Sequence, residues 1–428
     1  MQTPPPQPLT ESFRVDDLVL NAPAGLIRFS HLFSLSNQAY EAPEIALASA
    51  LIRPGQRVLE FGGGIGIVSR HAARLTGPDC VLSVEANPAA LAVAMDHLAR
   101  DGLGVAHRWG MVVAEGSAPQ GLEVDPESFL ASRPQPRSDA DQPRSDADQP
   151  RSDAALSPPA HSLSALMADW QPQVLVVDIE GGEAGLFAPT DLARVQALVV
   201  ELHPAMIGAN GCMGVVRDLA AQGLLADPAL VAGPVLGFSR TQSGPPPSDA
   251  ALHALFTCLA AADSGGNANA PAADLAAIAQ TIPESPLLYL LAMTALPRPD
   301  PARRTGLTTL LSHPMTATRA RTILANDLLA AGENEAALSL LAAPETGHAH
   351  WLKARALLPL QRPRDALPHA TAATKALPWF AQAHFLHART ALATANRQTA
   401  RTATAMAQSL DPTLPGLSDF AARVAKLA

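Results

Sequence analysis

Short apolar runs rich in β-branched residues alternate with longer segments of helical periodicity over the first 260 residues. Four such runs stand out: RVLEF (57–61), VLSVE (81–85), VLVVD (174–178) and ALVVE (197–201). Continuous apolar runs separated by helical segments are typical of βαβ units around a parallel sheet that is buried on both faces. The pattern therefore predicts an α/β domain.

This first domain ends with two apolar runs that no helical segment separates. They are GPVLGFSR (233–240) and LHALFTCL (252–259), and the connection between them is rich in Gly, Pro and Ser. Two apolar runs joined by turn-forming residues favour antiparallel pairing. We expect them to form an antiparallel pair of strands at one edge of the sheet.

The strand pattern disappears after Ala270, where alanine-rich and leucine-rich helical segments take over. Within this part a set of residues recurs after 34 positions: Ala349, His350, Leu352, Ala354, Arg355, Ala366 and Pro378 return as Ala383, His384, Leu386, Ala388, Arg389, Ala400 and Pro412. A weaker unit with a shortened second helix precedes them at 319–338. A 34-residue period with small residues at helix-packing positions is typical of tetratricopeptide repeats. A plain alanine-rich helical bundle remains an alternative, because most aromatic consensus positions are replaced.

Two tracts interrupt these patterns and set the expected boundaries. The heptapeptide PRSDADQ is repeated inside a proline-rich tract that has no apolar face, so a disordered loop is expected there. A second break, DSGGNANAPAAD, separates the two compositions. The expected parts are an N-terminal extension (1–35), an α/β domain (36–262) with its loop at about 116–160, a linker (263–273) and an all-α domain (274–428).

Composition narrows the function classes. The 428 residues carry 30 Lys and Arg against 39 Asp and Glu, a net charge of −9, and no basic stripe, which argues against a nucleic-acid partner. The three cysteines are too few and too far apart for a disulfide framework or a CxxC metal site. The longest apolar stretch, 287–296, is about half of a membrane span. With no secretory signal apparent at the N-terminus, we expect a cytoplasmic protein without a membrane span.

A glycine-rich turn follows the first predicted strand. Glu60 ends that strand, and Gly62, Gly64 and Gly66 lead into a helix that begins near Ile67. Glycines let the backbone approach a ligand closely and present amide groups at the helix start. The dinucleotide fingerprint would require glycine where Ile67 stands, which argues against a nicotinamide dehydrogenase. The acid at the strand end instead suits S-adenosylmethionine, which has no pyrophosphate and carries a cationic amino-acid portion. Glu60 could alternatively be a structural cap.

Glu85 ends the second predicted strand, 25 residues after Glu60. A carboxylate at this place in nucleotide-binding α/β folds accepts hydrogen bonds from ribose hydroxyls. The alternative is a solvated strand-end acid. Tyr40 and Glu41, just before a helical segment, could close over the methionine end of the cofactor, or Glu41 could simply be an acid at a helix N-terminus.

Acidic residues gather after the third predicted strand, where Asp178, Glu180 and Glu183 follow one another, and His203 follows the fourth. Open α/β sheets bind ligands at the carboxyl ends of their strands. Asp178 and His203 are the best candidates for a general base, with Glu180 beside them. Alternatively, Glu183 could begin a helix and His203 could be a packed structural residue. Asp178 and Glu180 could also ligate a cation, but without a third ligand we expect no metal.

Four ordered motifs, VLEFGGGIGIVS, VLSVEANPAAL, VLVVDIEGGEAGLF and ALVVELHP, together with the upstream Tyr40 and Glu41, resemble the FkbM family of S-adenosylmethionine-dependent methyltransferases over about residues 35–260. The resemblance implies a Rossmann-like, class I sheet of seven strands and methyl transfer, usually to a hydroxyl of a sugar or secondary metabolite. It also implies that Glu60, Gly62, Gly64 and Glu85 hold the cofactor and that 178–183 face the acceptor. Many members have lysine where this chain has Val176, so any role of that lysine is lost or supplied elsewhere.

Two functions from different classes follow. The first is an O-methyltransferase whose helical domain, 274–428, binds a protein partner or associates with itself. The second is a tetratricopeptide-type scaffold that carries a degenerate methyltransferase domain. The retained glycines and carboxylates favour the first, while the expanded loop and the drift towards alanine and proline favour the second.

Overall fold

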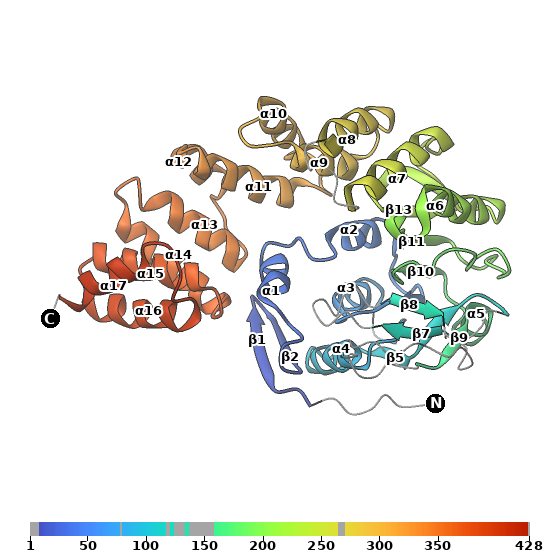
Figure 1. Cartoon of the computed structure of the whole chain (residues 1–428), viewed down its shortest axis with the longest axis horizontal. Coiled ribbons are helices and arrows are strands. Elements are labelled where there is room, and N and C mark those ends of the chain that lie inside the picture. Colours follow the sequence, from blue (N-terminus) through green and yellow to red (C-terminus); the bar gives the residue numbers. More distant parts are fainter. Residues whose placement is uncertain are drawn as a thin grey trace, which may run out of the picture. The chain divides into compact units, whose positions relative to one another are not determined.

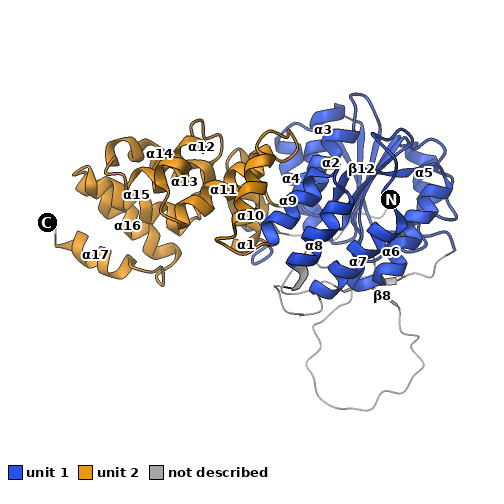
Figure 2. Cartoon of the chain, turned by 90° about the horizontal axis from the view of Figure 1, so that it is seen from above, with its two compact units in different colours: residues 1–10, 22–26, 41–295 blue, residues 11–21, 27–40, 296–428 orange. Residues whose placement is uncertain are grey.

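The computed structural model describes residues 8–77, 79–116, 120–123, 133–136, 158–263 and 270–426. The heptapeptide repeats that were expected to form a disordered loop lie, apart from residue 136, outside the described residues. The chain divides into two compact units, coloured separately in Figure 2. The first comprises 1–10, 22–26 and 41–295, and the second comprises 11–21, 27–40 and 296–428.

The core of the first unit is a seven-stranded sheet (Figure 1). Its spatial order is β12 (Leu225–Ala232), β13 (Val235–Ser239), β11 (Ala197–Glu201), β10 (Val174–Val177), β3 (Val58–Phe61), β4 (Val81–Glu85) and β5 (Val105–Trp109). The pairs from β11 to β5 are parallel, and β13 runs antiparallel to both its neighbours. This is the strand order of class I methyltransferase sheets, so the expected Rossmann-like fold is confirmed.

The four strands expected from apolar runs form at the expected places because their side chains are buried on both faces. Every residue of β3, β4 and β10 is buried. Helices cover both sides of the sheet (Figure 2). They are α2 (Ala42–Leu51), α3 (Ile67–Thr76), α4 (Pro88–Arg100), α5 (Leu163–Trp170), α6 (Pro204–Ala221) and α7 (Asp249–Asp263). Two short ladders accompany the sheet, β6 (Met111–Val113) with β9 (Ala160–Ser162), and β7 (Gln120–Glu123) with β8 (Arg133–Pro136).

The expected strand at 252–259 is wrong, because this segment lies within helix α7. Leu252, Leu255 and Phe256 are buried, whereas His253 and Ala254 between them are exposed. Burial at positions i, i+3 and i+4 follows the period of an α-helix, whereas a strand would bury every second residue or all of them. The antiparallel pair at the sheet edge is instead formed by β12 and β13, so the run at 233–240 pairs as expected but its partner is 225–232 and not 252–259.

Helices α8 (Ala270–Thr281) and α9 (Pro286–Ala295) belong to the first unit, although the linker was expected at 263–273. Helix α9 packs against β12. The Ser285 hydroxyl donates a hydrogen bond to the carbonyl of Val231, and Leu291 lies against Gly233. These contacts extend the sheet unit beyond the change in composition, and the second unit resumes at Leu296.

The second unit is built from paired helices, and its resemblance to tetratricopeptide repeats is confirmed at the level of fold. The helices are α10 (Pro301–Leu310), α11 (Ala317–Ala330), α12 (Asn334–Leu340), α13 (Gly347–Leu357), α14 (Pro363–Ala376), α15 (Ala381–Ala393), α16 (Arg397–Leu410) and α17 (Leu417–Ala425). The 34-residue period pairs α13 with α14 and α15 with α16. Ala354, Ala366, Ala388 and Ala400 are fully buried, so these small residues allow the helices to approach closely.

The N-terminal segment, expected to be a separate extension, packs on the helical repeats. It contributes β1 (Glu11–Val15), most of β2 (Leu18–Ala22) and α1 (Phe29–Ser36). The Asp16 carboxylate accepts a hydrogen bond of 2.6 Å from the backbone N–H of Gly347, at the start of α13. The Phe33 ring lies 5.5 Å from that of His348 and 5.9 Å from that of Phe380. Within the described residues, no helix is long and apolar enough to cross a membrane.

Candidate functional site

The glycine-rich turn connects β3 to α3, which begins at Ile67 as expected. Gly62, Gly64 and Gly66 have φ angles of 73°, 50° and 80°, in the left-handed region that favours glycine. A Cβ atom on Gly62 would overlap the carbonyl oxygen of Asp178, and one on Gly66 would lie 2.8 Å from the Cβ of Ala94. Glycine is therefore required both by the turn conformation and by the close approach of β10 and α4.

Glu85 is held beside this turn. Its side chain is buried, and its carboxylate accepts hydrogen bonds from the backbone N–H of Gly64 (2.7 Å) and of Asn87 (2.6 Å). Burial raises the pKa of Glu85, and the two backbone hydrogen bonds oppose this rise. Each carboxylate oxygen has two lone pairs, so Glu85 keeps acceptor capacity for a further donor beside the turn.

The Glu60 carboxylate is also buried, but it points to structural partners. It accepts hydrogen bonds from the hydroxyls of Ser69, on α3, and Ser83, on β4. Burial raises the pKa of Glu60, while these hydrogen bonds lower it. The contacts fit the alternative structural role of Glu60, and its contact with a cofactor stays a prediction.

Glu41 forms the N-cap of α2, with a left-handed φ of 48°. Its Oε1 atom would lie 3.7 Å from a Cβ built on Gly64, so its side chain borders the glycine-rich turn. Tyr40 is buried and belongs to the second compact unit, and its part in a cofactor site stays a prediction.

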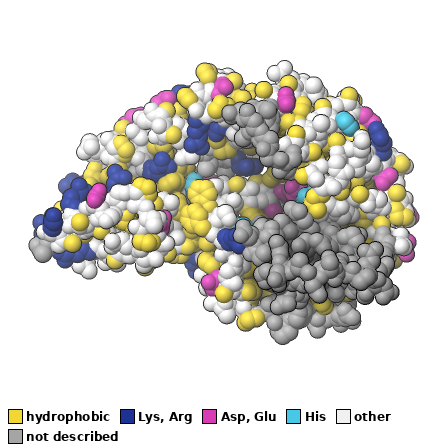
Figure 3. All heavy atoms as spheres, viewed as in Figure 1, with side chains coloured by type: hydrophobic (Ala, Val, Ile, Leu, Met, Phe, Trp, Pro, Cys, Tyr) yellow, Lys and Arg dark blue, Asp and Glu magenta, His cyan; other side chains and the backbone are white. Residues whose placement is uncertain are grey.

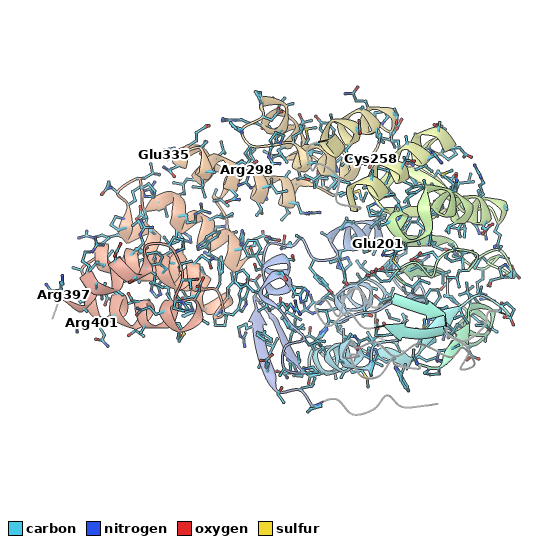
Figure 4. All side chains as sticks on the ribbon, viewed as in Figure 1. Glu201, Cys258, Arg298, Glu335, Arg397 and Arg401 are labelled. Carbon is cyan, nitrogen blue, oxygen red and sulfur yellow. The ribbon has the colours of Figure 1, made fainter. Side chains whose placement is uncertain are left out.

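The predicted acidic residues come together with His203 at the carboxyl ends of β10 and β11, which are parallel neighbours. The His203 Nε2 atom lies 3.5 Å from Asp178 Oδ1 and 3.4 Å from Glu180 Oε2. Glu180 has a φ of 50°, which is uncommon for a residue other than glycine. In Figure 3 acidic side chains and a histidine group near the middle of the face, at the place where Figure 4 labels Glu201.

Glu183 orients the imidazole from its other side. The Glu183 side chain is fully buried, and its Oε1 atom lies 2.9 Å from His203 Nδ1 and accepts a hydrogen bond of 3.1 Å from the N–H of Gly181. The Nδ1 atom is therefore the donor, and Nε2 faces the carboxylates of Asp178 and Glu180. Glu183 thus has a role that its alternative interpretation as a helix-start acid does not describe.

The titratable groups at this edge shift one another's pKa values. Burial raises the pKa of Asp178 to about 8, because the pull of His203 is smaller than the combined effect of burial and the neighbouring carboxylates. Burial lowers the pKa of His203, but the hydrogen bond with Glu183 and the surrounding carboxylates raise it to about 9. The pKa values of both groups therefore lie within about two units of neutrality, so the protonation state of this edge depends on pH.

Two further acids at this edge were not among the candidate residues. Glu201 ends β11, and Glu44 reaches its side chain from α2 and hydrogen-bonds with it. Burial and the charges of Asp178 and Glu44 raise the pKa of Glu201. Glu201 shows the same sequence signal as Asp178, because it is an acid at the end of a buried strand. Glu44 lies on α2, about one helical turn after Glu41.

No metal was expected because Asp178 and Glu180 had no third candidate ligand beside them, and Glu201 was not considered there. Asp178, Glu201 and His203 each offer one ligand atom, and these atoms lie within 4.8 Å of one another. The ligand types, two carboxylate oxygens and one imidazole nitrogen, are those of protein sites for divalent cations.

By sequence, the chain matches no family model and no curated protein. Among solved structures, a ribosomal protein L11 methylase from Lactobacillus delbrueckii subsp. bulgaricus is similar at 13% identity, with a TM-score of 0.29, over 53% of this chain and 86% of that one. The MamA RS-1 ArsTM double mutant is similar at 16% identity, with a TM-score of 0.36, over 40% of this chain and 99% of that one.

TTC0263, a thermophilic TPR protein in Thermus thermophilus, is similar at 16% identity, with a TM-score of 0.31, over 39% of this chain and 94% of that one. Similarities at such low identities give no information about the residues of the candidate site. The strand order itself defines a Rossmann-like methyltransferase fold, joined to a tetratricopeptide-like helical region.

Proposed function

We propose that this protein is an S-adenosylmethionine-dependent methyltransferase that methylates a hydroxyl oxygen of a sugar, glycan or secondary metabolite. The observation that carries the proposal is the pairing of two features on one sheet edge. The glycine-rich turn with Glu85 offers a nucleoside site, and the cluster around Asp178 offers acids and a histidine one strand away. The resemblance to the FkbM family adds to this proposal.

In the proposed reaction the acceptor oxygen attacks the methyl carbon, the carbon–sulfur bond breaks, and its electron pair stays on sulfur. Most of the rate gain comes from alignment of the three atoms, since the sulfonium is already activated. The hydroxyl proton passes to the Asp178 carboxylate. A base works best when its pKa lies near the working pH, and Asp178, with a pKa of about 8, meets this condition. Glu180 and His203 border the acceptor and hold this carboxylate in place.

The cofactor test is calorimetric titration of the full chain with S-adenosylmethionine. The variant Glu85→Ala removes the carboxylate that would accept from the ribose hydroxyls. Hydrogen bonds to charged groups contribute about 1.5–3 kcal/mol, so affinity should fall by roughly 10-fold to 100-fold. The control is Asp169→Asn, which removes an exposed carboxylate of α5 in the same unit. Lack of binding by the unsubstituted protein, or equal affinity in Glu85→Ala, would exclude the proposal.

For the helical region we propose binding of a protein partner or self-association. Its supporting feature is the array of paired helices with buried alanines at 34-residue intervals. The scaffold alternative differs in one measurable respect. If the chain acts only as a scaffold, Asp178→Asn leaves its cellular function intact, whereas the enzyme hypothesis requires that this variant lose function.

A further inference from the structure

Three ligand atoms from two adjacent strand ends converge at the acidic edge. Asp178 directly follows β10, Glu201 ends β11 and His203 lies two residues further on. One donor atom of each lies within 4.8 Å of the others, and the distance from His203 Nε2 to Asp178 Oδ1 is 3.5 Å. Metal–ligand distances of about 2.0–2.2 Å place the ligands of one cation roughly 3–4.4 Å apart. Small side-chain rotations would therefore bring all three onto one cation.

The imidazole is oriented as a metal ligand, and a bound cation would take the place of the proton on its Nε2 atom. Glu183, with no exposed side-chain surface, accepts from Nδ1 of His203 at 2.9 Å, which leaves Nε2 facing Asp178. Metal-ligating histidines commonly donate their other ring N–H to a carboxylate in this way, which fixes both the tautomer and the ring orientation.

Asp178 provides a second, independent observation at this edge. The Asp178 side chain is 29% exposed, but its Oδ1 atom is buried, lies 3.5 Å from His203 Nε2 and accepts no hydrogen bond from the described residues. Within the part of the chain that the structure describes, no Lys or Arg forms an ion pair with Asp178, Glu183 or Glu201. A buried acceptor without a partner is costly, and a cation would satisfy it.

We propose that Asp178, Glu201 and His203 bind one divalent first-row transition-metal cation, with Mn²⁺ as the probe. A mixed set of two oxygens and one imidazole nitrogen suits such ions better than Mg²⁺ or Ca²⁺, which prefer oxygen alone. Three protein ligands leave positions open for a further oxygen. In this last respect the inference rests on the proposed function, because the acceptor hydroxyl would take an open position, where a cation lowers its pKa.

The test is titration of the EDTA-stripped, dialysed full chain with Mn²⁺, with free Mn²⁺ followed by electron paramagnetic resonance. One saturable site is expected. Glu201→Gln keeps the size of the side chain and removes one ligand, and it should weaken binding at least 10-fold, the loss typical even for residues that only support a ligand. Asp169→Asn, an exposed acid of the same unit, should bind as the unsubstituted protein does.

Thermal unfolding of Glu201→Gln checks that this variant is folded, and Glu201→Asp, which keeps a carboxylate, should recover part of the affinity. Absence of a saturable site in the unsubstituted chain, or equal binding by folded Glu201→Gln, overturns the inference.

Calorimetric titration of the same preparation with S-adenosylmethionine separates this inference from the proposed function. Cofactor binding without a Mn²⁺ site overturns the metal site and leaves the methyltransferase proposal standing. A Mn²⁺ site without cofactor binding overturns the methyltransferase proposal and leaves the metal site standing.

Discussion

The interaction of Glu183 with His203 can be tested by a change that alters charge and little else. Glu183→Gln preserves the size of the side chain, and its amide oxygen can still accept from His203 Nδ1 and from the N–H of Gly181, as the carboxylate does at 2.9 Å and 3.1 Å. Because the position is fully buried, the substitution removes one negative charge next to the imidazole without exposing the site to water.

The size of the effect follows from the hydrogen bond. Burial alone lowers the pKa of His203, and it is the hydrogen bond and charge of Glu183, with smaller contributions from Asp178 and Glu180, that raise it to about 9. A hydrogen bond to a charged group contributes about 1.5–3 kcal/mol, and one pKa unit corresponds to about 1.4 kcal/mol. The pKa of His203 should therefore fall by roughly 1 to 2 units in Glu183→Gln.

The measurement is a pH titration of histidine ring signals by NMR in EDTA-treated protein. The chain has 13 histidines, and the signal that disappears in His203→Gln assigns the residue. His107 is an internal control, since burial lowers its pKa to about 4 and Glu183 does not contribute to that shift. An unchanged or higher His203 pKa in Glu183→Gln would refute the idea that Glu183 stabilises the imidazolium.

Three further predictions concern stability. Gly62 and Gly55 have similar positive φ angles of 73° and 77°, but only at Gly62 would a Cβ meet backbone. Urea denaturation should therefore show Gly62→Ala losing about 1–3 kcal/mol more than Gly55→Ala; equal losses would contradict the close approach of β10. Between pH 9 and pH 8, without metal, the free energy of unfolding should rise as pH falls. In that range His203 and Asp178 keep protons in the folded chain that they release in the unfolded chain, because their pKa values are about 9 and about 8 when folded against ordinary values of 6.5 and 3.8. Each retained proton changes the free energy of unfolding by up to about 1.4 kcal/mol per pH unit, and a flat profile would contradict both shifts. In the second unit, Asp16→Ala should cost about 1–2 kcal/mol in thermal denaturation and Asp16→Asn clearly less, because asparagine can still accept from the N–H of Gly347; equal losses would show that this hydrogen bond is not the cause.

The sequence predicts the central strands well because their burial leaves a local signal. Residues 58–61, 81–85 and 174–177 are buried at every position, and only a contiguous apolar run satisfies that environment. Strand β12 left no such signal. Pro228 interrupts its pattern, and the pairing of β12 with β13 is irregular between Ala226 and Val231, as expected for proline in an edge strand.

The candidate site could be predicted where strands that follow one another in the sequence are also neighbours in the sheet, as β10 and β11 are. Asp178 and His203 were expected together because each follows a strand, and those strands are neighbours. Glu44 could not be found in this way. It lies on α2, more than 130 residues before Asp178, and only the packing of that helix against β10 and β11 brings it to Glu201. Such a contact depends on tertiary structure and leaves no local pattern.

The cost of this arrangement gives a last prediction, in which stability and activity move in opposite directions. Several carboxylates surround one imidazole at the ends of β10 and β11, and Glu180 beside them has a left-handed φ of 50°. Because the pKa of Asp178 is raised to about 8, its ionised form is less favourable in the folded than in the unfolded chain. Asp178→Asn should therefore raise the unfolding temperature at pH 8 and above, corresponding to about 1 kcal/mol or more, and slow methyl transfer roughly 10²-fold to 10⁴-fold. Functional sites commonly lower stability in this way. A variant with lower stability would show that Asp178 serves the fold, and one that keeps full activity would exclude it as the base.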